Sequence, residues 1–256
     1  MTDTKITSSL LAVKGLSISF GGVVAVDKLD LDIVSGEIHA VIGPNGAGKT
    51  TMINLMSGLM KPDSGQILFD GTDLVRLSPV RRSHLGIARS FQITSIFRHF
   101  SALANVALAV QAHDGHSFRM WRPAGRDERL LGPAAAHLEQ VGLGARAEIL
   151  AGNLAHGEQR QLEIAMALAT HPRMLLLDEP TAGMGREDSE RMVALLQSLR
   201  GQYTMLLVEH DMDVVFALAD RITVLVYGRA IATGTPEEIR ANAAVREAYL
   251  GEDEAA

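Results

Sequence analysis

The sequence predicts an α/β fold with a mixed, mostly parallel core sheet, an N-terminal antiparallel β lobe and an inserted helical subdomain. Three observations predict it. The stretch at 38–42, apolar except for His39, and the apolar run at 174–177 indicate parallel strands that are buried on both faces. Segments 11–20 and 24–33 alternate apolar and polar residues, as half-buried antiparallel strands do. From about residue 92 to residue 169, strand signals give way to helical spacing.

The antiparallel lobe continues past its first two strands. Residues 66–69 predict a third strand, which the turn Asp70–Gly71 closes. Ser78 and Pro79 then predict a helix over 79–85, because serine caps a helix N-terminus and proline fits its first turn.

Within the helical subdomain, segments 101–111 and 127–141 are the best helix candidates. Between them, segment 113–125 contains glycines, a proline and the single tryptophan of the chain, so we expect an irregular insertion. Its arginines fit a solvated face. Contact with membrane headgroups or a membrane protein through Phe118, Met120 and Trp121 is the alternative.

After residue 178 strands and helices alternate again. We expect a helix over 186–200 with Arg200 in its last turn, a strand over 205–208, and a hairpin of segments 221–227 and 230–234. Thr235-Pro236-Glu237-Glu238 predicts a capped helix start.

The chain is expected to form one domain over 8–250. Segments 8–91 and 170–250 make its core with the β lobe, 92–169 makes the helical subdomain, and 251–256 is an acidic tail expected to fray.

A glycine-rich segment follows the first buried strand. Its residues, Gly43, Pro44, Asn45, Gly46, Ala47, Gly48, Lys49 and Thr50, fit the phosphate-binding pattern G-x-x-x-x-G-K-[ST], and an apolar helix over 52–59 follows. The glycines let the backbone fold around phosphates, and a helix N-terminus favours an anion. Lys49 would reach the β- and γ-phosphates, Thr50 would hold Mg²⁺, and we include Thr51 in the site. The sequence therefore predicts a nucleoside triphosphate site.

Two adjacent carboxylates end the apolar run at 174–177. Buried carboxylates are costly unless a cation or a reacting group uses them. Asp178 would bind the Mg²⁺ shell and Glu179 would act as general base toward the attacking water.

A third motif, at 153–161, opens an apolar helix and resembles the signature sequence of ABC ATPases. In that family the signature residues cap the ATP held by the opposite subunit, and here they would be Leu154, Ala155, His156, Gly157 and Glu158. Ala155 stands where the family has serine, so one hydroxyl directed at the γ-phosphate is missing. The resemblance implies an ABC ATPase fold that binds and hydrolyses ATP with Mg²⁺.

Other landmarks of the resemblance follow in order. Gln92 matches the glutamine that senses the γ-phosphate and Mg²⁺, and His210 matches the switch histidine that contacts the γ-phosphate and holds the attacking water. Phe20 matches the aromatic residue that stacks on adenine. Gly185 stands where the family has an aspartate in the loop that crosses to the other nucleotide site.

The resemblance covers about residues 8–250 and is closest to the ATP-binding subunits of branched-chain amino acid importers. Segments 20–26, 208–212 and 231–239 point to that branch, whose relatives also carry urea, short amides or aromatic compounds. It implies a second ABC ATPase subunit, with a heterodimer favoured and a homodimer open. It also implies two membrane permease subunits, a substrate-binding protein, and a peripheral place on the cytoplasmic face of the inner membrane. A non-transport ABC ATPase that acts on nucleic acid or ribosomes is the alternative.

Composition agrees with this class. The chain has 256 residues, 47% of them hydrophobic, so it can bury a sizeable core. No apolar run approaches the roughly 18 residues of a membrane span. A net charge of -6 disfavours a broad nucleic-acid surface, and the absence of cysteine excludes disulfides and cysteine-bound zinc.

Overall fold

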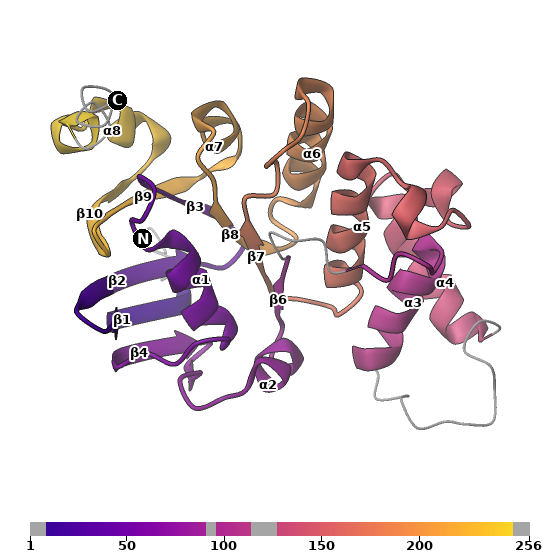
Figure 1. Ribbon diagram of the computed structural model, residues 1–256, viewed down its shortest axis with the longest axis horizontal. Helices are drawn as coiled ribbons and strands as arrows, with labels where there is room; N and C mark the ends of the chain where they lie inside the picture. The colour runs from indigo at the N-terminus through magenta and orange to yellow at the C-terminus, as the bar shows by residue number, and fades with distance from the viewer. Residues whose placement is uncertain (1–8, 91–95, 114–126, 248–256) are drawn as a thin grey trace, which may run out of the picture. The chain divides into compact units, whose positions relative to one another are not determined.

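The structure, a computed structural model, describes residues 9–90, 96–113 and 127–247 (Figure 1). The chain divides into two compact units. The first contains the described parts of 1–82, 176–179 and 199–256, and the second those of 83–175 and 180–198. The expected insertion over 113–125 lies almost wholly outside the described residues, as do Gln92 and the tail at 251–256.

The first unit contains a four-stranded antiparallel sheet with the order β2-β1-β4-β5. Its strands are β1 (Ser9–Phe20), β2 (Val23–Val34), β4 (Ser64–Phe69) and β5 (Thr72–Asp73). Alternate residues of β2 are buried, among them Leu29, Leu31 and Ile33. One face of the strand is therefore apolar, as its alternating pattern predicts.

The second sheet has the order β10-β9-β3-β8-β7-β6. Its strands are β3 (Ile38–Ile42), β6 (Ile87–Arg89), β7 (Met174–Asp178), β8 (Thr204–Val208), β9 (Arg221–Val226) and β10 (Arg229–Gly234). Strand β3 pairs in parallel with both β8 and β9, and β10 pairs antiparallel with β9. Every residue of β3, β7 and β8 is buried, which explains why their sequences are mostly apolar.

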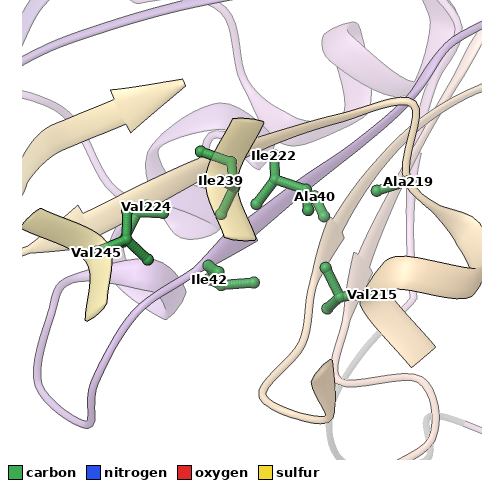
Figure 2. Close-up of a cluster of buried hydrophobic side chains, with 8 residues drawn as sticks. All are labelled: Ala40, Ile42, Val215, Ala219, Ile222, Val224, Ile239 and Val245. Carbon is green, nitrogen blue, oxygen red and sulfur yellow. The ribbon is translucent and has the colours of Figure 1, made fainter. Parts of the chain in front are cut away.

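A cluster of buried side chains joins β3 to the C-terminal part of the chain (Figure 2). Its members come from β3, β9, helix α7 (Met212–Leu218), helix α8 (Pro236–Ala241) and their flanks. They are Ala40, Ile42, Val215, Ala219, Ile222, Val224, Ile239 and Val245. The strand that precedes the glycine-rich segment is thus packed against residues about 200 positions later in the sequence.

The second unit is mainly helical. It contains α3 (Ala102–His113), α4 (Glu128–Gln140), α5 (His156–Leu168) and most of α6 (Arg186–Leu199). Helices α3, α4 and α5 pack against one another. None of the described helices combines the length and apolar character that crossing a bilayer requires.

The predicted starts of two helices are confirmed by their N-caps. The Thr235 hydroxyl accepts a hydrogen bond from Glu238 N (3.3 Å), and a Glu238 carboxylate oxygen accepts one from Thr235 N (2.8 Å). Helix α2 (Pro79–His84) follows Ser78, whose hydroxyl oxygen accepts a hydrogen bond from Arg81 N (3.4 Å).

Helices α1 and α6 differ from the prediction in ways that bear on the contacts at their ends. Helix α1 spans Lys49–Ser57, three residues earlier than expected, because Gly48 starts it and Gly58, at φ 84°, ends it. Helix α6 ends at Leu199, so Arg200 is outside its last turn and instead donates to the carbonyl oxygen of Leu218. Strands β5 and β6 and helix α7 were not predicted.

Candidate functional site

The glycine-rich segment forms a loop between β3 and α1 in the first unit. Gly43, Gly46 and Gly48 have φ values of 155°, 78° and 100°, which residues with a side chain rarely adopt. A Cβ on Gly43 would lie 2.0 Å from the Leu225 carbonyl oxygen, and one on Gly48 would lie 2.3 Å from that of Ala25. Backbone from β9 and β2 therefore fixes the path of the loop.

Lys49 and the start of α1 fit an anion. The Lys49 side chain is buried, and its ammonium group donates hydrogen bonds to the carbonyl oxygens of Gly43 and Pro44, the latter at 3.0 Å. No side chain caps the N-terminus of α1, and its first turn contains no acidic residue. Backbone amides without a side-chain cap and an ammonium group at one helix end suit a phosphate group. Asn45, Ala47, Thr50 and Thr51 complete the loop and the first turn, and the Thr50 side chain is exposed.

The acidic pair lies at the end of β7. Asp178 is 1% exposed and is the last residue of the strand. Glu179 follows with φ 49°, a conformation that is strained for a residue with a side chain. Its amide donates to the carbonyl oxygen of Val208 (2.9 Å), which ties this turn to the end of β8.

His210 follows β8 and lies beside Glu179. Its Nδ1 atom is 3.8 Å from Oε1 of Glu179 and 3.8 Å from Oε2 of the buried Glu209. The Glu209 carboxylate also accepts a hydrogen bond from the His210 amide (3.1 Å), so it helps to hold the turn. The imidazole side chain is 63% exposed and can meet a ligand.

These turns share one edge of the sheet. Strand β3 runs parallel to β8, and the glycine-rich loop and His210 follow their carboxyl ends. Ligands of open parallel sheets bind outside those ends. Sequence reasoning placed the loop, Asp178, Glu179 and His210 at strand ends, and the structure brings these residues together in the first unit.

Thr50 and Asp178 are the described residues of the expected magnesium site. Both belong to the first unit, and both offer the oxygen atoms that Mg²⁺ prefers. Among the described residues no three histidine or acidic side chains converge as a ready-made metal site. Protein sites that hold Mg²⁺ together with a nucleotide use only one or two carboxylates, which fits this pair.

Phe20 ends β1 and precedes the turn Gly21–Gly22. It pairs with Val23 across that turn, and its side chain is 49% exposed. Strand β2 continues from the turn to Ala25, the residue that contacts the loop at Gly48. The Phe20 side chain is thus partly exposed to solvent, and a ligand can reach it.

The signature residues lie in the second unit, at the start of α5. Leu154 is buried, Ala155 is the N-cap residue, and His156, Gly157 and Glu158 form the first turn. A Cβ on Gly157 would lie 2.8 Å from Cγ of Asp188, so a larger residue here would force the Asp188 side chain to move.

The N-cap of α5 is incomplete. The Glu158 carboxylate accepts a hydrogen bond from Ala155 N (2.9 Å), which is half of a capping box, but alanine has no side-chain oxygen for the other half. Ala155 already has the extended backbone of an N-cap, with φ -60° and ψ 159°.

Ala155→Ser is therefore expected to raise the free energy of unfolding of the helical unit by about 1 kcal/mol. Urea denaturation of the nucleotide-free chain would measure it. Ala135→Ser, the same change inside α4, is expected to give no gain, because serine is a poorer helix former than alanine. Equal effects of the two changes would contradict the capping argument.

Sequence reasoning missed Arg82, which supports α1 from its far end. Its side chain is 1% exposed, and its guanidinium group donates to the carbonyl oxygens of Leu55 (2.6 Å) and Met56 (2.7 Å). A cation at a helix C-terminus is favoured by the helix dipole, and here it also satisfies the final carbonyls. Burial lowers the pKa of Arg82, which the nearby Asp73 carboxylate partly opposes. The Ser78–Pro79 signal located its helix but gave no indication of this contact.

Comparisons with known proteins agree with this geometry. The family model of the ABC transporter matches residues 26–182. The family model of the branched-chain amino acid ATP-binding cassette transporter matches residues 231–255, which include α8.

Two relatives and one solved structure extend these matches. The high-affinity branched-chain amino acid transport ATP-binding proteins BraF of Pseudomonas aeruginosa and LivG of Escherichia coli are each 41% identical over 250 residues. Those residues are 95% of this chain and 98% of each relative. The crystal structure of the ADP conformation of an ATP-binding cassette from an ABC transporter is 29% identical, with a TM-score of 0.84. That match covers 96% of this chain and 100% of the other.

Proposed function

The chain belongs to the ABC transporter family, and from this premise we propose that it is the ATP-hydrolysing subunit of an importer for branched-chain amino acids. One observation carries the catalytic part of the proposal. In the first unit, the phosphate loop, the Asp178–Glu179 pair and His210 follow neighbouring strands of one sheet. That arrangement suits an attack on the terminal phosphate of a nucleotide held by the loop.

Each side chain has a role that its position allows. Lys49 exchanges the loop carbonyls for oxygen atoms of the β- and γ-phosphates. Glu179 accepts a proton from water as the water oxygen attacks the γ-phosphorus and the bond to the bridging oxygen breaks, which gives ADP and phosphate. His210 lies beside Glu179, where it can hold that water and the γ-phosphate. Mg²⁺, held by Thr50, Asp178 and Gln92, would neutralise the phosphate charge.

The signature segment serves the nucleotide of a second subunit. Ala155 is the N-cap residue of α5, and His156 and Gly157 open its first turn, so the N-terminal end of this helix favours an anion. Two chains would then enclose two ATP molecules, and we favour a heterodimer. Ala155 removes one hydroxyl from the site that this chain completes, and Gly185 removes one carboxylate from the crossing loop, so the two sites are unequal in this proposal.

The C-terminal family match supports the choice of cargo. Residues 231–255 match the model of the branched-chain amino acid group, and both relatives above carry that substrate in their names. We therefore propose that the chain binds two permease subunits at the cytoplasmic face of the inner membrane and acts with a substrate-binding protein.

Co-purification tests the proposal. The tagged full-length chain is isolated from detergent-solubilised membranes and its partners are identified by mass spectrometry. Two polytopic permease chains and a second ATPase are expected, and the reconstituted complex is expected to take up leucine only with ATP. Ribosomal or DNA-repair proteins without any membrane protein would overturn the transport function. Uptake of urea, amides or aromatic compounds instead of leucine would overturn the proposed cargo alone.

A further inference from the structure

Tyr227 follows a fourth strand of the same sheet. Strand β9 runs parallel to β3 and ends at Val226, so Tyr227 stands at the sheet edge that carries the phosphate loop. The ends of β3, β7 and β8 carry the loop, Glu179 and His210, all of which have a role in the proposed reaction. Tyr227 holds the corresponding position after β9, and the proposed reaction gives it no role.

The backbone of Tyr227 is unfavourable for its residue type. Tyr227 and Gly228 have φ values of 47° and 78° and form the two-residue turn between β9 and β10. Turns with two positive φ values favour asparagine, aspartate and glycine, because other side chains strain them. Glu179 has nearly the same φ, 49°, at the end of β7. Backbone strain of this kind is found most often at functional sites.

The turn is fixed to the phosphate loop. The Gly228 amide donates to the carbonyl oxygen of Ala47 (2.9 Å), and its carbonyl accepts from Asp27 N (2.9 Å). Arg229 adds an ion pair to Asp27, with Nε 2.8 Å from Oδ2. A Cβ on Gly228 would lie 2.8 Å from the Ala25 carbonyl oxygen, so the backbones are in direct contact. Tyr227 therefore keeps a constant place beside the loop.

Packing does not explain the tyrosine ring. It is 86% exposed, more than any other large apolar or aromatic side chain of the described residues. Tyr227 is thus an aromatic residue with a strained backbone and little contact with the core. Its neighbour Gly228 is hydrogen-bonded to Ala47 of the phosphate loop. Aromatic rings bind nucleobases by stacking, whatever the base.

We propose that Tyr227 is a nucleotide-binding residue whose ring packs against the base of the nucleotide held by the phosphate loop. The inference rests on the proposed ATP site, in which Phe20 is the other aromatic contact. It adds a second ring, on a different strand, that contacts the base and not the phosphates.

Tyr227→Asn separates this role from a turn role, because asparagine fits the turn better than tyrosine and carries no ring. Tm of the full-length chain is expected to rise. Calorimetry is expected to show MgATP affinity about tenfold lower, in the range of a lost base–aromatic stack, with inorganic tripolyphosphate affinity unchanged. Tyr227→Phe keeps the ring and is the matched control, expected to bind MgATP like the wild type.

The outcomes are distinct. Wild-type MgATP affinity in Tyr227→Asn would show that Tyr227 is a turn residue only and would overturn the inference. Equal loss of MgATP and tripolyphosphate affinity would also overturn it, because the residue would then act through the shape of the loop. Failure of the wild type to bind either probe would overturn the proposed ATP site itself.

Discussion

Glu179→Gln is expected to lower ATP turnover by a factor of about 10²–10⁴, the usual contribution of a general base. Glutamine keeps the size of the side chain but cannot accept the proton of the attacking water. MgATP affinity is expected to stay within about threefold of the wild type, because the proposed phosphate contacts are Lys49 and the loop amides, and not Glu179. Phosphate release from the assembled complex measures turnover, and calorimetry measures affinity.

Glu187→Gln is the matched control for this change. Its carboxylate is 84% exposed on α6 and pairs with Arg191, so turnover is expected to match the wild type. Turnover of Glu179→Gln within a few-fold of the wild type would remove Glu179 from the role of base. A parallel loss of MgATP affinity would show instead that Glu179 holds the loop through its turn.

Gly43→Ala is expected to abolish high-affinity nucleotide binding. The new Cβ would lie 2.0 Å from the Leu225 carbonyl oxygen, so the loop or β9 must move. Backbone strain costs roughly 1–3 kcal/mol, and overpacking costs roughly as much again. A loss of about 3 kcal/mol in binding corresponds to more than about a hundredfold in Kd. Calorimetry with MgATP measures Kd, and thermal denaturation shows whether the chain still folds.

Gly22→Ala makes the same change in the same unit without these contacts. No atom lies within 4 Å of the Cβ position at Gly22, and its φ is ordinary, so MgATP affinity is expected to stay unchanged. A Gly43→Ala variant that folds and binds MgATP as tightly as Gly22→Ala would contradict the geometry described for the loop.

Local signals predicted most of the elements around the site. The mostly apolar runs of β3, β7 and β8 are short, and each is followed by glycine or by polar residues, which favours a buried strand over a helix. The capping box at Thr235 predicted the start of α8 because both of its hydrogen bonds are made within four residues. Such features depend only on neighbours in the sequence.

The missed features depend on contacts that sequence spacing does not reveal. Strand β6 has three residues, too few for an alternating pattern to appear. Helix α7 has seven, and its start at Asp211 was hidden because the same segment matched a histidine motif. Arg82 looks like any charged helix residue until Leu55 and Met56 are placed beside it. The hairpin was expected with Tyr227 in its first strand, but Tyr227 lies in the turn, and the contact of that turn with Ala47 spans most of the chain.

The packing of β3 has a consequence for protein synthesis. The strand is made early, yet its pairing partners β8 and β9 begin at residues 204 and 221, and Ile239 and Val245 complete its cluster. At roughly 5–20 residues per second, a ribosome needs about 10–30 s to extend the chain from β3 to β8. For that time the nascent chain carries the apolar run 38–42 without the strands that bury it. Exposed apolar surface of this kind favours aggregation, and the phosphate loop gains its neighbours Leu225 and Gly228 only after most of the chain has been made.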